Sequence, residues 1–130
     1  MPIQIVARNL ELTSAQREIV ERRLAFALGR FGNRVGRVTV SLEDLNGPKG
    51  GLDQRCRIEV SLVPSGTVMA EATDAEIEPA VGRAAERAAR RVKSELDRRR
   101  TSVIRQLRRD IAADGGPQSP GPVSRGTGSP

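Results

Sequence analysis

The chain has 130 residues, a formal net charge of +6, one cysteine, and neither histidine, tryptophan nor tyrosine. A single cysteine excludes an internal disulfide. Without histidine the chain lacks the commonest general base and metal ligand, so we expect neither an enzyme nor a metal or cofactor site. The N-terminus has no secretory pattern and no apolar run approaches the roughly 18 residues of a membrane span, which predicts a soluble, cytoplasmic protein.

The excess positive charge lies in one segment. Residues 1–80 hold ten basic and eleven acidic side chains, whereas residues 81–111 hold eleven basic and four acidic ones, a net charge of +7. Twenty of the basic residues are arginines. This concentration favours a polyanionic partner such as nucleic acid. The alternative is a solvated helix face, typical of an arginine-rich proteome.

A short strand and a helix are the first expected elements. Apolar and polar residues alternate over Ile3–Arg8, which predicts the strand. Thr13 and Gln16 have the spacing of a capping box, so a helix is expected to begin at Thr13. Gly32 and Asn33 are expected to end it. Its apolar stripe consists of Ala15, Ile19, Val20, Leu24, Ala27, Leu28 and Phe31.

Three further strands follow, each with period-two alternation of apolar and polar residues. They are predicted over Val38–Glu43, Cys56–Leu62 and Val68–Thr73. One polar face per strand indicates a sheet that is covered on one side only. Cys56 is in phase with the apolar residues, so we expect a buried thiol rather than a reactive one. The loop at 46–51 is glycine-rich but lacks the residue spacing of a phosphate-binding P-loop. Residues 64–66 are expected to form a tighter hairpin turn between the last two strands.

A second helix is predicted to begin between Asp74 and Glu78, because Pro79 is tolerated only in a first turn. Its apolar stripe is Ile77, Val81, Ala84, Ala85, Ala88, Val92 and Leu96, with a weaker continuation at Val103, Leu107 and Ile111. The order β-α-β-β-β-α predicts an α+β two-layer sandwich, in which a four-stranded sheet carries both helices on one face and the first two strands are parallel. Residues 1–112 are assigned to this domain and residues 113–130 to a disordered Gly/Pro/Ser tail.

The outward face of the second helix is the candidate site. Its arginines at near-whole-turn spacing are Arg83, Arg87, Arg90, Arg98 and Arg105. Residues spaced in this way share one side of a helix, and guanidinium groups bind phosphate in a bidentate manner. The predicted RNA-binding residues on this face are Arg83, Arg87, Arg90 and Arg98, and the surface also includes Arg22, Arg23, Arg30, Arg91 and Lys93. The outer sheet face has no aromatic residue, so base stacking on the sheet is not expected.

Four segments carry a resemblance to a known family. They read TSAQREIV at 13–20, RFGNRVGRVTVSL at 30–42, CRIEVSL at 56–62 and AEATDAEIEPAVGRAAERAARRVK at 70–93. Together they resemble the ribosome hibernation-promoting factor family over Ile3–Arg100. The resemblance places Arg87, Arg90 and Lys93 at basic positions of the family's second helix, and Arg34 near a basic position after the first helix. The chain departs from the family at Glu78, where a tyrosine is common, and lacks the dimerising domain of the long members.

The resemblance implies a protein that binds the small ribosomal subunit, blocks the messenger and transfer RNA path, and silences idle ribosomes in a stress response. The small subunit and its rRNA are the expected partners, with no membrane, cofactor or small-molecule substrate. Two alternatives stay open. A protein-interaction module would bind an acidic protein, and nuclease treatment would leave that partner bound. An enzyme using carboxylates alone would need a deep pocket containing Asp74, Glu76 or Glu78.

Overall fold

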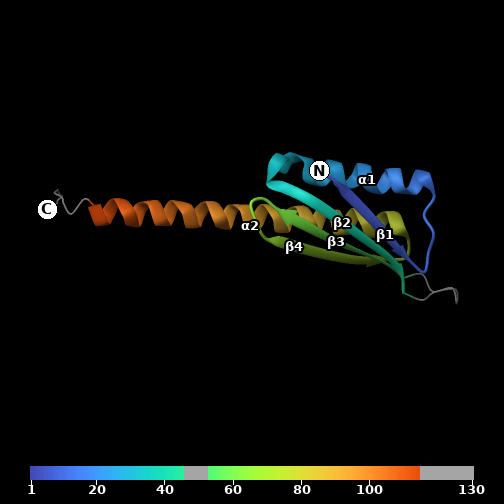
Figure 1. Cartoon of the computed structure of the whole chain (residues 1–130). Helices are drawn as coiled ribbons and strands as arrows, with labels where there is room; N and C mark the ends of the chain where they lie inside the picture. Colours follow the sequence, from blue (N-terminus) through green and yellow to red (C-terminus); the bar gives the residue numbers. More distant parts are fainter. Residues whose placement is uncertain (46–52, 115–130) are drawn as a thin grey trace. The chain divides into compact units, whose positions relative to one another are not determined.

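A computed structural model describes residues 1–45 and 53–114 of the chain. The expected loop at 46–51 and the part of the expected tail beyond residue 114 lie outside the described residues. The elements are β1 (Ile3–Arg8), α1 (Ser14–Leu28), the 3-10 helix η1 (Gly29–Arg34), β2 (Val35–Asp44), β3 (Gln54–Leu62), β4 (Thr67–Asp74) and α2 (Ile77–Asp114) (Figure 1). The chain forms two compact units, residues 1–94 and the residues from 95 onward, and α2 contributes to both.

The first unit contains a four-stranded sheet in the order β1-β2-β3-β4 (Figure 1). β1 pairs with β2 in parallel, and the other two pairs are antiparallel. The register aligns Ile5 with Val40, Val40 with Ile58, and Ile58 with Ala70, so one apolar row crosses the sheet. The predicted α+β architecture, with both helices packed against a mixed sheet, is confirmed.

Both helices start from the same end of the sheet. Arg8, the last residue of β1, pairs with Glu43, and Asp74, the last residue of β4, pairs with Gln54. Gln54 itself lies opposite Asp44, next to Glu43. Because α1 follows β1 and α2 follows β4, the two helices begin at this end and lie together on the apolar face.

The core is formed by the sheet and by the inward faces of the helices. α1 contributes Val20, Leu24 and Leu28, and α2 contributes Ala80, Val81, Ala84, Ala85, Ala88, Ala89 and Val92. The many alanines of α2 allow its backbone to approach the sheet closely. Cys56 is buried in this core, as predicted, and desolvation raises the pKa of its thiol to about 12.

The end of α1 differs from the sequence prediction. The capping box at Thr13 and Gln16 is present, with Oγ1 of Thr13 accepting from the backbone N–H of Gln16 at 3.1 Å. The helix ends at Leu28, however, and the chain tightens into η1, within which Gly32 adopts a φ of 58°. Gly32 therefore redirects the 3-10 turns rather than ending α1. Ala15, which was assigned to the apolar stripe, is exposed, because it lies in the first turn.

The second unit consists, in its described part, of residues 95–114 of α2. The helix extends to Asp114, two residues into the segment assigned to the tail. Four of its large apolar side chains are open to solvent, namely Val103, Ile104, Leu107 and Ile111. Ion pairs within the helix join Glu95 to Arg98 and Arg99. In the described part of the chain, no helix is long and apolar enough to cross a membrane.

Candidate nucleic-acid interface

A groove between α1 and α2 brings together three of the predicted arginines. Its volume is about 600 Å³. It is lined by Arg22, Arg23, Phe26 and Ala27 of α1 and by Pro79, Gly82, Arg83, Ala85 and Glu86 of α2. We call this feature the α1–α2 groove. The predicted residues Arg22, Arg23 and Arg83 thus lie around one concave surface of the first unit.

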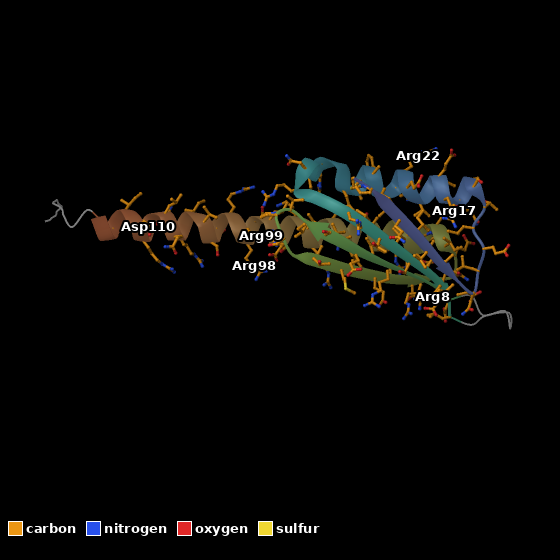
Figure 2. All side chains as sticks on the ribbon, viewed as in Figure 1. Arg8, Arg17, Arg22, Arg98, Arg99 and Asp110 are labelled. Atoms are coloured by element: carbon orange, nitrogen blue, oxygen red, sulfur yellow. The ribbon has the colours of Figure 1, made fainter. Side chains whose placement is uncertain are left out.

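The two α1 arginines of the groove carry uncompensated charge. Both Arg22 and Arg23 are exposed, and neither forms an ion pair with any carboxylate in residues 1–45 or 53–114. Figure 2 labels Arg22 on α1. A Cβ atom placed on Gly82 would lie 3.2 Å from Nη1 of Arg23. Gly82 therefore leaves room for the Arg23 guanidinium beside the backbone of α2.

Two arginines of α2 are hydrogen-bonded to the edge strand. Arg83 forms an ion pair with Asp74 at 3.0 Å and donates to the carbonyl oxygen of Thr73 at 2.8 Å. Arg87 donates to the carbonyl oxygen of Glu71 at 2.6 Å. β4 lies at the edge of the sheet, where backbone groups have no neighbouring strand. These two guanidinium groups therefore occupy acceptors that an added strand would otherwise use.

The other basic residues of α2 do not share one environment. Arg90 lies 4.0 Å from Glu86 in an exposed pair that contributes little stability. Arg91 lines a separate hollow with Arg57, Met69, Ala70 and Glu71, and Lys93 is exposed. In the second unit, Arg98 and Arg99, which are labelled in Figure 2, both donate hydrogen bonds to the side chain of Glu95. These hydrogen bonds lower the pKa of the Glu95 carboxyl.

Arg30 and Arg34 lie beyond the end of α1, in η1. The guanidinium of Arg30 lies 4.9 Å from the ring centroid of Phe31, a cation–π contact. Nε of Arg34 donates to the carbonyl oxygen of Val63 at 3.3 Å, and the N–H of Val63 donates to the carbonyl oxygen of Arg34. Arg34 thus helps to hold the turn between β3 and β4.

The sequence analysis did not identify Phe26 or Gly82 as functional residues. Phe26 is 90% exposed and lies in the α1–α2 groove. The sequence did contain a signal, because Phe26 falls outside the apolar stripe of α1 and lies three residues after the basic pair Arg22 and Arg23. Across residues 1–45 and 53–114, no cluster of three or more carboxylate or thiol groups is arranged to hold a metal ion. The arrangement can bind anions and flat apolar groups.

Comparisons with known proteins agree with this fold. The family model described as Sigma 54 modulation protein / S30EA ribosomal protein matches residues 3–100. The N-terminal domain of Thermus thermophilus Protein Y is 34% identical, with a TM-score of 0.60 over 72% of this chain and 98% of that one. A ribosomal subunit interface protein from Coxiella burnetii is 17% identical, with a TM-score of 0.56 over 78% of this chain and 99% of that one. At this identity the match shows a similar fold. A search of the curated proteins gave no significant match.

Proposed function

We propose, from the premise that this chain belongs to the Sigma 54 modulation protein / S30EA ribosomal protein family, that it binds the small ribosomal subunit and inhibits translation on idle ribosomes. Members of this family are ribosome-associated proteins that bind ribosomes and inhibit translation, and the family is not one of enzymes. The resemblance found in the sequence is thereby confirmed. The choice of subunit and the contacts with rRNA are part of the proposal.

The observation that carries the proposal is the unpaired charge of Arg22 and Arg23 beside Arg83 in the α1–α2 groove. Guanidinium groups without an internal carboxylate partner can bind phosphate without first breaking an ion pair. Arg90 and Arg91 extend the basic surface along α2, where both are exposed. Phosphate contacts of this kind fix the position of a protein on folded RNA without reading its sequence.

The proposed contributions of the predicted residues are unequal. Arg22, Arg23 and Arg91 have no ion-pair partner in the described ranges, so we rank them first as phosphate contacts. Arg83 and Arg87 are hydrogen-bonded to β4 and can offer only their remaining N–H groups. Arg30, Arg34, Lys93 and Arg98 complete the proposed surface. Residues 1–112 form the proposed binding domain, with residues 113–130 as its tail.

Co-sedimentation with small ribosomal subunits at increasing salt tests the proposal. Each neutralised phosphate releases counterions, so the affinity is expected to fall steeply with ionic strength. Arg22→Ala and Arg23→Ala should each lower the slope of log affinity against log salt by about one. Arg37→Ala is the matched control, because Arg37 is also exposed but belongs to the outer face of the sheet. Its slope should stay at the wild-type value.

Two results would contradict the proposal. Binding that is absent, or that does not depend on salt, excludes phosphate contacts as its basis. A partner that is still captured after nuclease treatment would instead indicate an acidic protein. Inhibition of translation is tested in a cell-free system, where the wild-type chain should reduce protein synthesis and the Arg22→Ala/Arg23→Ala variant should reduce it less.

A further inference from the structure

Phe26 is exposed to a degree that the fold does not require. Its side chain is 90% exposed, while the buried positions of α1 are Val20, Leu24 and Leu28. Packing in the core therefore does not account for an aromatic ring at this position. The chain has one other aromatic residue, Phe31, which is half-buried and lies beside the guanidinium of Arg30. Phe26 is thus the aromatic ring that is open to a partner.

The surroundings of Phe26 combine apolar and cationic groups. Ala27, Pro79 and Ala85 supply apolar lining of the α1–α2 groove. Arg22 and Arg23 precede Phe26 by about one helical turn, and neither is paired with a carboxylate in the described parts of the chain. The groove also contains one carboxylate, Glu86, which lies 4.0 Å from Arg90. A partner that fits must offer a flat apolar group and negative charge a few ångströms away from it.

We propose that the α1–α2 groove receives an unpaired base of the rRNA, which stacks on Phe26 while Arg22 and Arg23 bind the flanking phosphates. This inference rests on the proposed function and adds a direct base contact to it. A nucleotide contains a planar base and an anionic phosphate within one unit, which matches the groove. Unpaired bases of folded RNA stack on exposed aromatic rings in this way. An apolar protein side chain fits less well, because two unpaired guanidinium groups would be desolvated against it.

Substitutions at Phe26 distinguish base stacking on its ring from simple apolar contact. Phe26→Ala is expected to weaken binding to small subunits by about tenfold to a hundredfold. Phe26→Leu should weaken it nearly as much, because leucine keeps apolar volume but has no π face, whereas Phe26→Tyr should bind like the wild type. The slope of log affinity against log salt should stay unchanged in all three, since no phosphate contact is removed.

Val63→Ala is the matched control, because Val63 is an exposed apolar residue in the turn between β3 and β4. It should bind like the wild type. The far-ultraviolet circular dichroism of every variant should match the wild type, because both side chains are exposed. If Phe26→Ala or Phe26→Leu binds like the wild type, the stacking inference is wrong while the proposed function stands. If the wild-type chain does not bind small subunits, both fail.

A photocrosslinking residue identifies the partner directly. The full chain with p-benzoyl-phenylalanine in place of Phe26 is irradiated on small subunits, and the crosslinked component is analysed. Attachment to a single unpaired nucleotide of the rRNA, located by a stop in primer extension, is the expected result. Attachment to a ribosomal protein, or to no component of the subunit in a chain that still co-sediments, overturns the inference.

Discussion

Arg87 donates a hydrogen bond of 2.6 Å to the backbone carbonyl oxygen of Glu71, and so joins the exposed face of α2 to the free edge of β4. Arg83 makes the equivalent contact one turn earlier, with Thr73. The spacing of four residues along the helix thus matches a spacing of two residues along the strand. Two of the arginines that the sequence analysis assigned to RNA binding, Arg83 and Arg87, therefore also stabilise the first unit.

This relationship predicts a loss of stability for Arg87→Ala. Removing the guanidinium breaks a charge-assisted hydrogen bond to a partly solvated carbonyl, so the free energy of unfolding should fall by about 1 kcal/mol. Urea denaturation measures the change. Arg90→Ala is the control, because its pair with Glu86 is exposed at 4.0 Å, and its effect should stay below about 0.5 kcal/mol. Equal effects from the two substitutions would contradict the structural role of Arg87.

Gly82→Ala is expected to raise the stability of the fold while it weakens binding to small subunits. Alanine favours a helix over glycine, so the free energy of unfolding should rise by roughly 0.5–1 kcal/mol. The new Cβ would lie 3.2 Å from Nη1 of Arg23, and this flexible side chain must move aside. Binding to small subunits should therefore weaken, as measured by co-sedimentation.

A double substitution checks the mechanism assigned to Gly82. In the Arg23→Ala background, Gly82→Ala should cause no further loss of binding, since the displaced group is already absent. A full additional loss would show that the alanine acts on something other than Arg23. A decrease in stability from Gly82→Ala alone would show that Arg23 cannot move.

Cys56 predicts how stability changes at alkaline pH. Burial raises the pKa of this thiol from its ordinary value of 9.0 to about 12. Between these values the unfolded chain releases the thiol proton while the folded chain keeps it. The free energy of unfolding should therefore be constant with respect to this group below pH 9 and should fall as pH rises, by roughly 1.4 kcal/mol per pH unit up to about pH 12.

The amino-acid composition makes the contribution of Cys56 easy to identify in this alkaline measurement. The chain has no tyrosine and only two lysines, so it is poor in the residue types that ordinarily ionise in this range. Cys56→Ala is the control and should be less stable at neutral pH because it leaves a small cavity. Its slope of stability against pH between 9 and 12 should be much shallower. A slope equal to that of the wild type would mean that Cys56 is not the responsible group.

Thr13→Ala tests the start of α1. Oγ1 of Thr13 accepts from the N–H of Gln16, and the N–H of Thr13 donates to the Gln16 side chain at 2.9 Å. Losing the hydroxyl should lower the free energy of unfolding by about 1 kcal/mol. Ser14→Ala, one residue further into the helix, should change stability much less in the same urea titration. Similar losses at both positions would contradict the capping role of Thr13, because the higher helix propensity of alanine would by itself raise stability at either position.

Local patterns in the sequence predicted much of the fold, because they depend on residues close together in the chain. The Thr13–Gln16 capping box needs only two positions three residues apart. The alternation around Cys56, Ile58 and Val60 fixes which face of β3 is buried. The end of α1 was misplaced, since Gly32 is compatible both with a helix end and with a bend inside 3-10 turns.

The candidate site was predicted only in part, because its geometry depends on residues distant in sequence. Periodicity placed Arg83 and Arg87 on the outside of α2 correctly. It could not show that the edge carbonyls of β4 lie beside them, because that requires the packing of α2 against the sheet. Phe26 was missed for a similar reason, since its groove exists only where α1 meets α2.

The solvent-exposed apolar side chains of residues 95–114 have a consequence for melting experiments. Val103, Leu107 and Ile111 gain little from burial there, so this stretch of helix depends on local pairs such as Glu95 with Arg99 and Gln106 with Asp110. Helices of about 20 residues held by such pairs are marginal in water and fray gradually on heating. Ellipticity at 222 nm should thus decline before the sheet unfolds, and it would understate the thermal resistance of residues 1–94.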